Sequence, residues 1–321
     1  EVEKDGKTLY KVTATAPDLV QHTDASKLSN EYVHYFEKQK AKEGNVYYSF
    51  NELVKDMQAN PTGEFKLGAD LNAANVKPNG KSYVTNTFKG KLLSNDGGRF
   101  TIHNLARPLF GRVENAHVHD INLGNVDINL PGENKVAPLG EMFKNSNIEN
   151  IKVTGNVVGN NDVTGMVNKL DESNMRNVAF IGNVTSVGTG GQYLSGIVGE
   201  NWKGYVERAY VNANITGKKA KAAGIVYWSQ NGGDNNAVGR EGAIKKSVAK
   251  GTINVEDPIK TGGFIGSNHM LGSVEDSVSM MKVNKGNGEI FYGSEDIDDD
   301  GGYWSGMRLN RNLVVTGVSE G

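Results

Sequence analysis

The chain has 321 residues, with 35 Lys and Arg against 37 Asp and Glu, and no cysteine. A formal net charge of −2 provides no global field that would attract nucleic acid or an anionic membrane, so neither is expected as a partner. The lack of cysteine excludes disulfides and thiolate metal sites, and it is typical of an exported protein that folds without an oxidase. Glycine is abundant, with 41 residues, which favours many tight corners between short strands.

Two amphipathic helices are predicted near the N-terminus. Residues 27–43 carry apolar side chains at near-helical spacing, from Leu28 to Phe36, and stop at Gly44. A second helix begins after Ser49, which has capping-box spacing to Glu52, and ends at Asn60-Pro61. After residue 63 the apolar period falls from about 3.6 to about 2, which indicates strands and no further helix.

From about residue 109 the sequence repeats. Six stretches align, and they begin at Val113, Ile148, Met175, Val206, Ile244 and Val274. In five of the six a small or apolar residue recurs at offsets 3, 5 and 9, as Ile151, Val153 and Val157 do in the second copy. The first copy slips by one residue after Val118, which we interpret as a bulge.

One repeat cannot bury its apolar positions alone, whereas a stack of repeats closes a continuous core. We therefore predict an all-β fold, a right-handed parallel β-helix (solenoid) with an N-terminal helical cap. The cap region covers residues 1–63 and the β-helix covers residues 64–295. Residues 296–321 form an acidic loop and a strand that lead into a further part of the protein. The competing interpretation is a β-sandwich with chance internal similarity.

A family resemblance rests on two sets of residues. Gly196-Ile197-Val198-Gly199 and Gly263-Phe264-Ile265-Gly266 resemble the short glycine repeat known as the GLUG motif. The order from Phe50-Asn51-Glu52-Leu53 to Phe65-Lys66-Leu67-Gly68, and on to Phe100-Thr101-Ile102-His103, adds specificity. Over residues 45–290 the chain resembles the non-catalytic N-terminal region of the streptococcal zinc metalloproteases that include the IgA1 proteases.

This resemblance implies a secreted protein at the cell surface of a Gram-positive bacterium. Its zinc is held in a separate catalytic domain by a His-Glu-x-x-His helix, and no His-Glu pair occurs in this sequence. The region is therefore expected to be non-catalytic and to hold no zinc. Its implied partners are a host glycoprotein, such as immunoglobulin A, and the catalytic domain of the same protein.

Exposed aromatic residues are the candidate binding groups. Six of them lie in or beside expected loops, where interface anchors often sit: Trp202, Tyr205, Tyr227, Trp228, Tyr303 and Trp304. These rings serve equally well as packing at the ends of coils. With them, the chain is either an accessory module that positions a glycoprotein for the protease or a surface adhesin or spacer.

Two sets of residues in the sequence are candidate metal sites. Asp296, Asp298 and Asp300 precede Gly301 in the order that brings alternating carboxylates onto calcium, although Met307 replaces the usual bidentate glutamate. The other is the pair His117 and His119, which flank an inward Val118 and therefore point outward together. Two ligands do not complete a zinc shell, so adventitious metal binding is the plainer interpretation.

A polysaccharide-cleaving β-helix would carry acidic or basic groups in matching positions of successive coils. The corresponding outward column instead contains Lys152, Ala179, Tyr210, Val248 and Val278. It supplies no pair of carboxylates for general acid and base catalysis, so this third function is the least favoured.

Overall fold

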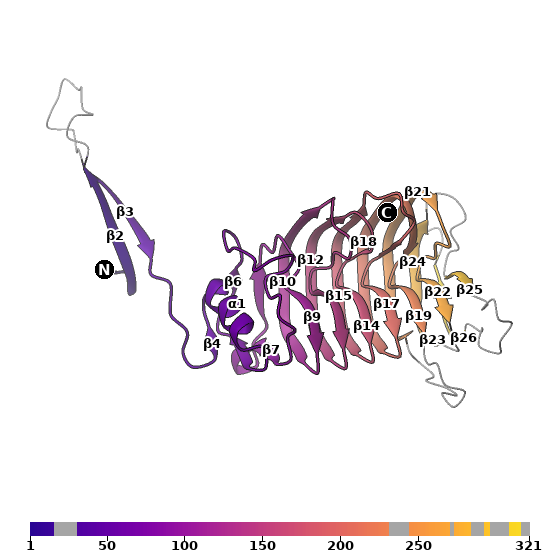
Figure 1. Cartoon of the computed structure of the whole chain (residues 1–321), viewed down its shortest axis with the longest axis horizontal. Helices are drawn as coiled ribbons and strands as arrows, with labels where there is room; N and C mark the ends of the chain where they lie inside the picture. Colours follow the sequence, from indigo (N-terminus) through magenta and orange to yellow (C-terminus); the bar gives the residue numbers. More distant parts are fainter. Residues whose placement is uncertain (16–30, 231–243, 270–272, 284–291, 296–307, 316–321) are drawn as a thin grey trace, which may run out of the picture. The chain divides into compact units, whose positions relative to one another are not determined.

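The computed structural model describes residues 1–15, 31–230, 244–269, 273–283, 292–295 and 308–315. Its chain forms two compact units, residues 1–41 and residues 42–321 (Figure 1). This division falls earlier in the chain than the expected boundary at residue 63.

The first unit is a three-stranded antiparallel sheet of β1 (Val2–Lys4), β2 (Lys7–Thr15) and β3 (Glu31–Glu37). The helix predicted for residues 27–43 is therefore wrong across β3, and residues 27–30 lie outside the described ranges. Tyr32-Val33-His34-Tyr35-Phe36 is a run of aromatic and β-branched side chains suited to a strand. Pairing with β2, which places Tyr10 opposite Phe36, outweighs the near-helical spacing.

The second predicted helix is present as α1 (Phe50–Ala59), the one α-helix of the described residues. Ser49 accepts a hydrogen bond from the backbone N–H of Glu52 at 3.3 Å, as its spacing predicts. The buried face of α1 includes Phe50, whose ring meets that of Tyr83 edge-on at 5.1 Å. The helical cap therefore consists of one helix, not two.

The rest of the second unit is a parallel β-helix, as predicted (Figure 1). Its first coils use β4 (Val46–Tyr47), β5 (Glu64–Leu67), β6 (Leu71–Asn72), β7 (Lys91–Ser94) and β8 (Phe100–His103). A long-strand sheet continues from them through β10 (His117–Leu130), β12 (Asn147–Gly159), β15 (Asn174–Ser186), β18 (Tyr205–Ala223), β20 (Ile244–Lys245), β21 (Val248–Pro258), β23 (Ser273–Glu275), β24 (Val278–Val283), β26 (Arg308–Asn310) and β27 (Leu313–Val314).

Two further faces complete each coil. A seven-stranded sheet contains β9 (Phe110–Glu114), β11 (Gly140–Lys144), β14 (Val167–Asp171), β17 (Val198–Trp202), β19 (Val226–Gln230), β22 (Ile265–His269) and β25 (Tyr292–Glu295). A short face contains β13 (Val163–Thr164), β16 (Tyr193–Ser195) and the end of β18. No helix among the described residues is long and apolar enough to cross a membrane.

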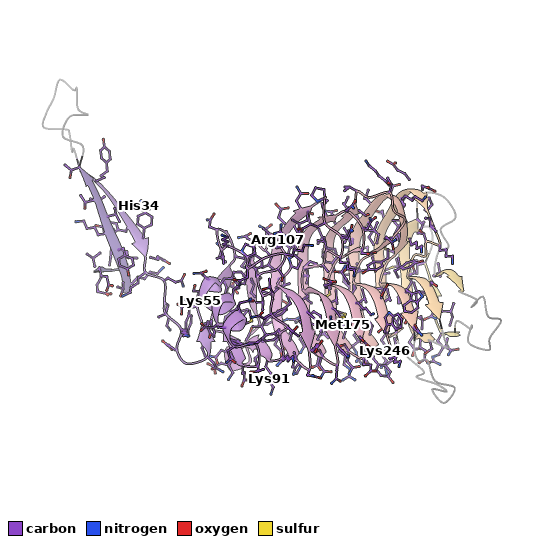
Figure 2. The ribbon with its side chains drawn as sticks, in the orientation of Figure 1. His34, Lys55, Lys91, Arg107, Met175 and Lys246 are labelled. Carbon is purple, nitrogen blue, oxygen red and sulfur yellow. The ribbon has the colours of Figure 1, made fainter. Side chains whose placement is uncertain are left out.

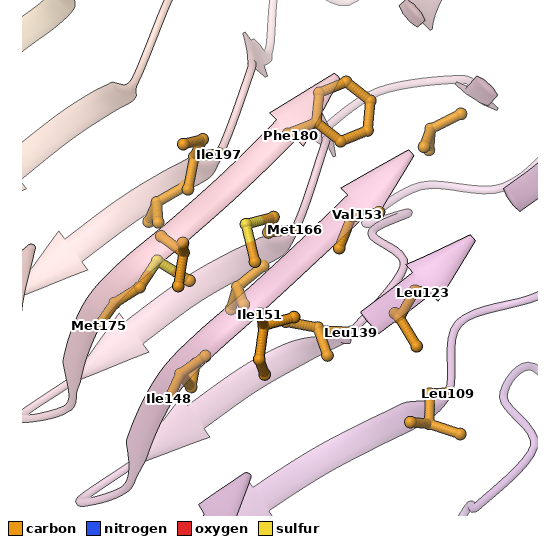
Figure 3. Close-up of a cluster of buried hydrophobic side chains, with 14 of the residues drawn as sticks. Leu109, Leu123, Leu139, Ile148, Ile151, Val153, Met166, Met175, Phe180 and Ile197 are labelled. Carbon is orange, nitrogen blue, oxygen red and sulfur yellow. The ribbon is translucent and has the colours of Figure 1, made fainter. Parts of the chain in front are cut away.

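The core is the ladder of apolar side chains that the repeat predicts. Ile151 pairs with Val178 of the next coil, and Val178 pairs in turn with Ala209. All three side chains are at most 2% exposed. Figure 3 shows the same stacking for Ile151, Val153 and Phe180 between the strands.

The first repeat copy is misaligned in the sequence prediction. Ile148 pairs with Val118, so the first copy begins at Val118, and Val113 instead pairs with Phe143 in the seven-stranded sheet. A bulge is present, but the register of β10 shifts between Leu123 and Val126. Ile128 therefore takes the place that Val157 holds in the next coil.

Each coil turns through a left-handed corner in the long-strand sheet. The φ angles of its corner residues lie between 48° and 54°: Asp120, Asn150, Asn177, Arg208, Lys246, Asp276 and Arg311. Asparagine tolerates this conformation, and here it also bonds along the stack, since Asn177 Nδ2 donates to Asn150 Oδ1 at 2.7 Å. Lys246 marks this corner at the surface in Figure 2.

Candidate aromatic recognition site

The candidate site begins with the glycine turns of the repeat. Gly196, the first glycine of one turn, lies where coils nearly touch, because a Cβ there would stand 2.2 Å from the carbonyl oxygen of Gly224. The second glycine, Gly199, leaves room for the ring of Tyr193, whose Cε2 would lie 2.2 Å from an added Cβ. In a later turn Gly266 makes the same space for Tyr227. The glycines of the repeat thus allow the rings of Tyr193 and Tyr227 to pack against the outside of the seven-stranded sheet.

Two pairs of rings gather at the edge where the short face meets this sheet. Tyr193 and Tyr227 stack with centroids 6.5 Å apart and are 8% and 6% exposed. Trp202 and Trp228, from adjacent strands β17 and β19, lie 4.9 Å apart at 48° and are partly exposed. Ring pairs at these distances are mutually attractive, and the rigid stack of coils holds them in place.

A surface cavity of about 210 Å³ lies among these rings. All four aromatic side chains line it, and its polar rim consists of Gln192, Glu200, Lys221 and Lys260. Lys221 pairs with Tyr193 across the short face, whereas Glu200 pairs with Trp228 in the seven-stranded sheet. The cavity therefore has aromatic walls and hydrogen-bonding groups around its opening, which is the usual composition of a small-ligand site.

The charged groups of the site are already partly organised. Trp202 donates its indole N–H to Glu200 Oε2 at 3.2 Å, which fixes this carboxylate beside the ring. Lys169 lies with Nζ 4.5 Å from the centroid of Trp202 and so occupies one indole face. The backbone N–H of Lys221 donates to the carbonyl oxygen of Gln192 at 3.0 Å, whereas its side chain forms no hydrogen bond or ion pair with the described residues, so the ammonium is available for a ligand.

A buried carboxyl group lies close behind the cavity. Burial, and after it the negative charge of Glu200, raises the pKa of Asp162 above its ordinary value of 3.8. The backbone N–H of Tyr193 and the charges of Lys135 and Lys221 act in the opposite direction. Asp162 Oδ1 has no hydrogen-bond partner among the described residues, which is consistent with a destabilised carboxylate.

The structure brings together three of the six aromatic residues predicted for binding. Trp202, Tyr227 and Trp228 line the cavity, whereas Tyr205 does not. Tyr303 and Trp304 lie outside the described residues. The sequence analysis missed the other ring, Tyr193, together with the four polar residues of the rim, Gln192, Glu200, Lys221 and Lys260. A signal for Tyr193 existed in the second glycine of the repeat, Gly199, where an added Cβ would meet the Tyr193 ring before any backbone atom of the neighbouring coil.

The candidate metal sites gain no support. Asp296, Asp298 and Asp300 lie outside the described residues, so calcium binding there stays a prediction. Within the described ranges no group of three or more His, Asp or Glu side chains is placed to hold a metal ion.

His117 and His119 do point outward around the buried Val118. Their rings stack at 3.9 Å, and Nε2 of His117 lies 3.8 Å from a carboxylate oxygen of Glu149. Burial and the neighbouring His119 lower the pKa of His117. His117 therefore favours its neutral form.

The outward column considered for polysaccharide cleavage has the predicted register. Lys152, Ala179, Tyr210, Val248 and Val278 pair in succession across the long-strand sheet. The strand before them contributes Asn122 to the same column. No carboxylate occupies the column in these described strands, so the acid and base of a glycosidase have no candidates there.

Comparison with known proteins confirms the family resemblance. Residues 1–155 match the family model described as the M26 IgA1-specific metallo-endopeptidase N-terminal region. The whole chain is 44% identical to zinc metalloprotease ZmpB of Streptococcus pneumoniae serotype 4, of which it spans 17%. Over 48% of its length it is 35% identical to an immunoglobulin A1 protease of Streptococcus pneumoniae, of which the match spans 8%.

Solved structures agree with the fold. A structure named IgA1 Protease superposes on 98% of this chain with a TM-score of 0.69 and 25% identity, and the match covers 24% of that protein. A crystal structure from Bacteroides ovatus, whose title describes an immunoglobulin A1 protease, superposes on this chain with a TM-score of 0.60 at 16% identity. The match covers 84% of each chain, and this second likeness concerns the fold alone.

Proposed function

We propose that this chain, which is 44% identical over its whole length to a streptococcal zinc metalloprotease, is a non-catalytic accessory region of a protease of the IgA1-protease type. Its role is to recognise or position a host glycoprotein, such as immunoglobulin A, for a catalytic domain elsewhere in the protein. That domain holds the zinc, and the protein is exported to the surface of a Gram-positive bacterium.

The aromatic cavity of the solenoid is the observation that carries this proposal. Partly exposed tryptophans are frequent anchors of protein interfaces, and Trp202 and Trp228 lie side by side on adjacent strands. Parallel coils on both sides hold them rigidly, so little side-chain entropy is lost on binding. The names of the relatives, which include immunoglobulin A1 proteases, supply the class of partner.

A direct test separates recognition from catalysis. The purified chain is expected to bind immunoglobulin A1 on a sensor surface and to leave it intact after prolonged incubation with zinc. Zinc-dependent cleavage by this chain alone would contradict the non-catalytic assignment. A matched pair of variants, Trp228→Ala in the cavity and Tyr210→Ala on the long-strand sheet, then locates binding, because only the first is expected to weaken it.

The adhesin alternative makes a different prediction for the complete protein. If the region serves the protease, Trp228→Ala in the full-length protein raises the KM for the glycoprotein and leaves cleavage of a short peptide unchanged. A binding defect without any change in KM would instead assign the region to adhesion. Absence of a downstream His-Glu-x-x-His helix in the gene would exclude the protease assignment altogether.

A further inference from the structure

We propose that the Trp202–Trp228 cavity binds one saccharide residue that carries a carboxylate, an acidic sugar of the sialic or uronic acid type. This inference rests on the proposed recognition of a glycoprotein and names the chemical group that is recognised. Its basis is the combination of rings, rim groups and charges around the cavity.

The shape of the cavity sets the size of the ligand. Its volume of about 210 Å³ falls below the roughly 300–1,000 Å³ of sites for drug-sized molecules, so it accommodates one ring-sized group. The tyrosine pair forms the buried part of the wall, and the two indoles form the partly exposed part. A pyranose presents a flat face of C–H groups to such rings and keeps its hydroxyl groups at the edge.

The rim supplies partners for these hydroxyl groups. Glu200 accepts hydrogen bonds, Lys221 and Lys260 donate them, and the amide of Gln192 does both. A purely apolar side chain of a peptide would leave four polar groups around it without new partners. Because unsatisfied polar groups cost free energy when a ligand covers them, the rim favours a ligand rich in hydroxyl groups.

The charges favour an anionic sugar over a cationic ligand. Two ammonium groups and one carboxylate surround the opening, and that carboxylate already accepts from the indole of Trp202. An aromatic cage for a quaternary ammonium needs an open indole face, yet Lys169 already places its own cation on Trp202. The ammonium of Lys221 lies at the opening and feels the negative charge of Asp162, but no side-chain hydrogen bond or ion pair ties it to a described residue, so it is the group best placed to pair with a ligand carboxylate.

Ligand-observed NMR with the full 321-residue chain tests the proposal. The probes are sialyllactose, lactose and glucuronic acid, each as a free compound. Saturation transfer is expected for sialyllactose and glucuronic acid and to be weaker for lactose. The transfer is expected to reach the ring protons, because these contact the indoles. Absence of transfer to both acidic sugars would overturn the proposal.

Two variants locate the site and its charge preference. Trp228→Ala is expected to weaken sialyllactose binding about tenfold or more, which corresponds to about 1.4 kcal/mol. Lys221→Gln, which leaves the aromatic wall intact, is expected to reduce the preference for sialyllactose over lactose at least about threefold. Tyr210→Ala, on the long-strand sheet, is the control for a lost aromatic ring, and circular dichroism checks the fold of each variant. An unchanged preference in Lys221→Gln would contradict the assigned anion partner.

The outcome also distinguishes this inference from the proposed function. If the chain binds immunoglobulin A1 before and after enzymatic removal of its sugars with equal affinity, recognition of the glycoprotein stands and the saccharide site is refuted. If the chain binds the acidic sugars but not the glycoprotein, the saccharide site stands and the proposed function fails.

Discussion

The ring of Tyr193 occupies the space that a side chain on Gly199 would need, with its Cε2 only 2.2 Å from an ideal Cβ position on that glycine. The same relation recurs between Tyr227 and Gly266 in later coils. Because both rings line the aromatic cavity, a glycine of the repeat that looks structural also builds the site. Repeat and site are thus formed by the same residues.

Gly199→Ala is expected to disturb this arrangement. The added methyl group would also lie 2.7 Å from the backbone oxygen of Asn168, so rotation of Tyr193 alone does not relieve the clash. Overpacking of this kind costs about 1–3 kcal/mol, and urea unfolding should show a corresponding loss of stability. Gly132→Ala is the control, since a Cβ there meets nothing within 4 Å. Equal stabilities for the two variants would show that the Tyr193 ring is not confined.

The inward ladder makes a second prediction. Val153 is completely buried between coils, so Val153→Asp places a carboxylate without a partner in the core and is expected to cost more than about 4 kcal/mol. The adjacent Lys152 is exposed, and Lys152→Ala should change stability by less than about 0.5 kcal/mol. Circular dichroism melts of both variants test this contrast. Similar losses in the two variants would refute the alternation of inward and outward residues along β12.

The inward ladder could be predicted because its signal is local and repeated. Ile151, Val178 and Ala209 hold the same offset in their copies, whatever the length of the loops between them. The first copy is misaligned because the residues after Val113 match the later copies through a similar corner of the coil and not through the equivalent strand. Asn115 and Asn150 both adopt a left-handed conformation, with φ of 49° and 54°, so the residues around them look alike although they belong to different corners of the coil.

The cavity could be predicted only in part. Trp202 and Trp228 stand out as aromatic residues near loops, but their contact depends on the pairing of β17 with β19. Lys260 reaches the rim from the coil that follows Lys221, in a segment that has no fixed offset from the repeat. The spacing of residues in the sequence does not predict that Lys221 and Lys260 lie at the same cavity, because their proximity depends on how the coils stack.

The histidine pair predicts a loss of stability in mild acid. Burial and the adjacent His119 lower the pKa of His117 below its ordinary 6.5, so the unfolded chain binds protons more readily than the folded one. The stability that neutral His117 contributes is therefore present above pH 6.5 and declines as the pH falls through that value toward the lowered pKa. Glu149 and Asp120, which favour the protonated form, moderate the effect, and the charge of Lys91 adds to it.

His117→Gln should reduce this dependence. Chemical unfolding at about pH 8 and about pH 5 is expected to show a smaller loss of stability for the variant than for the parent chain. His103→Gln, which removes a partly exposed histidine beside Asp70, controls for the change in total charge. A parent-like loss in His117→Gln would show that other groups dominate the acid response.

The ionisation of Asp162 should change stability with pH in the opposite direction to that of His117. Burial and the charge of Glu200 raise the pKa of its carboxyl group above 3.8, so the folded chain holds this proton more tightly than the unfolded chain. Ionisation therefore costs stability: the penalty is absent well below pH 3.8 and is complete above the raised pKa. Asp162→Asn keeps a side-chain oxygen for the backbone N–H of Tyr193 and tolerates the φ of 55° at this position.

Asp162→Asn is accordingly expected to raise the melting temperature at neutral pH, and this gain should shrink toward zero at about pH 3. Asp127→Asn, on an exposed position of β10, is the matched control and should leave the melting temperature nearly unchanged at both pH values. A lower melting temperature for Asp162→Asn at neutral pH would mean that Lys135 and Lys221 stabilise the carboxylate more than burial and Glu200 destabilise it.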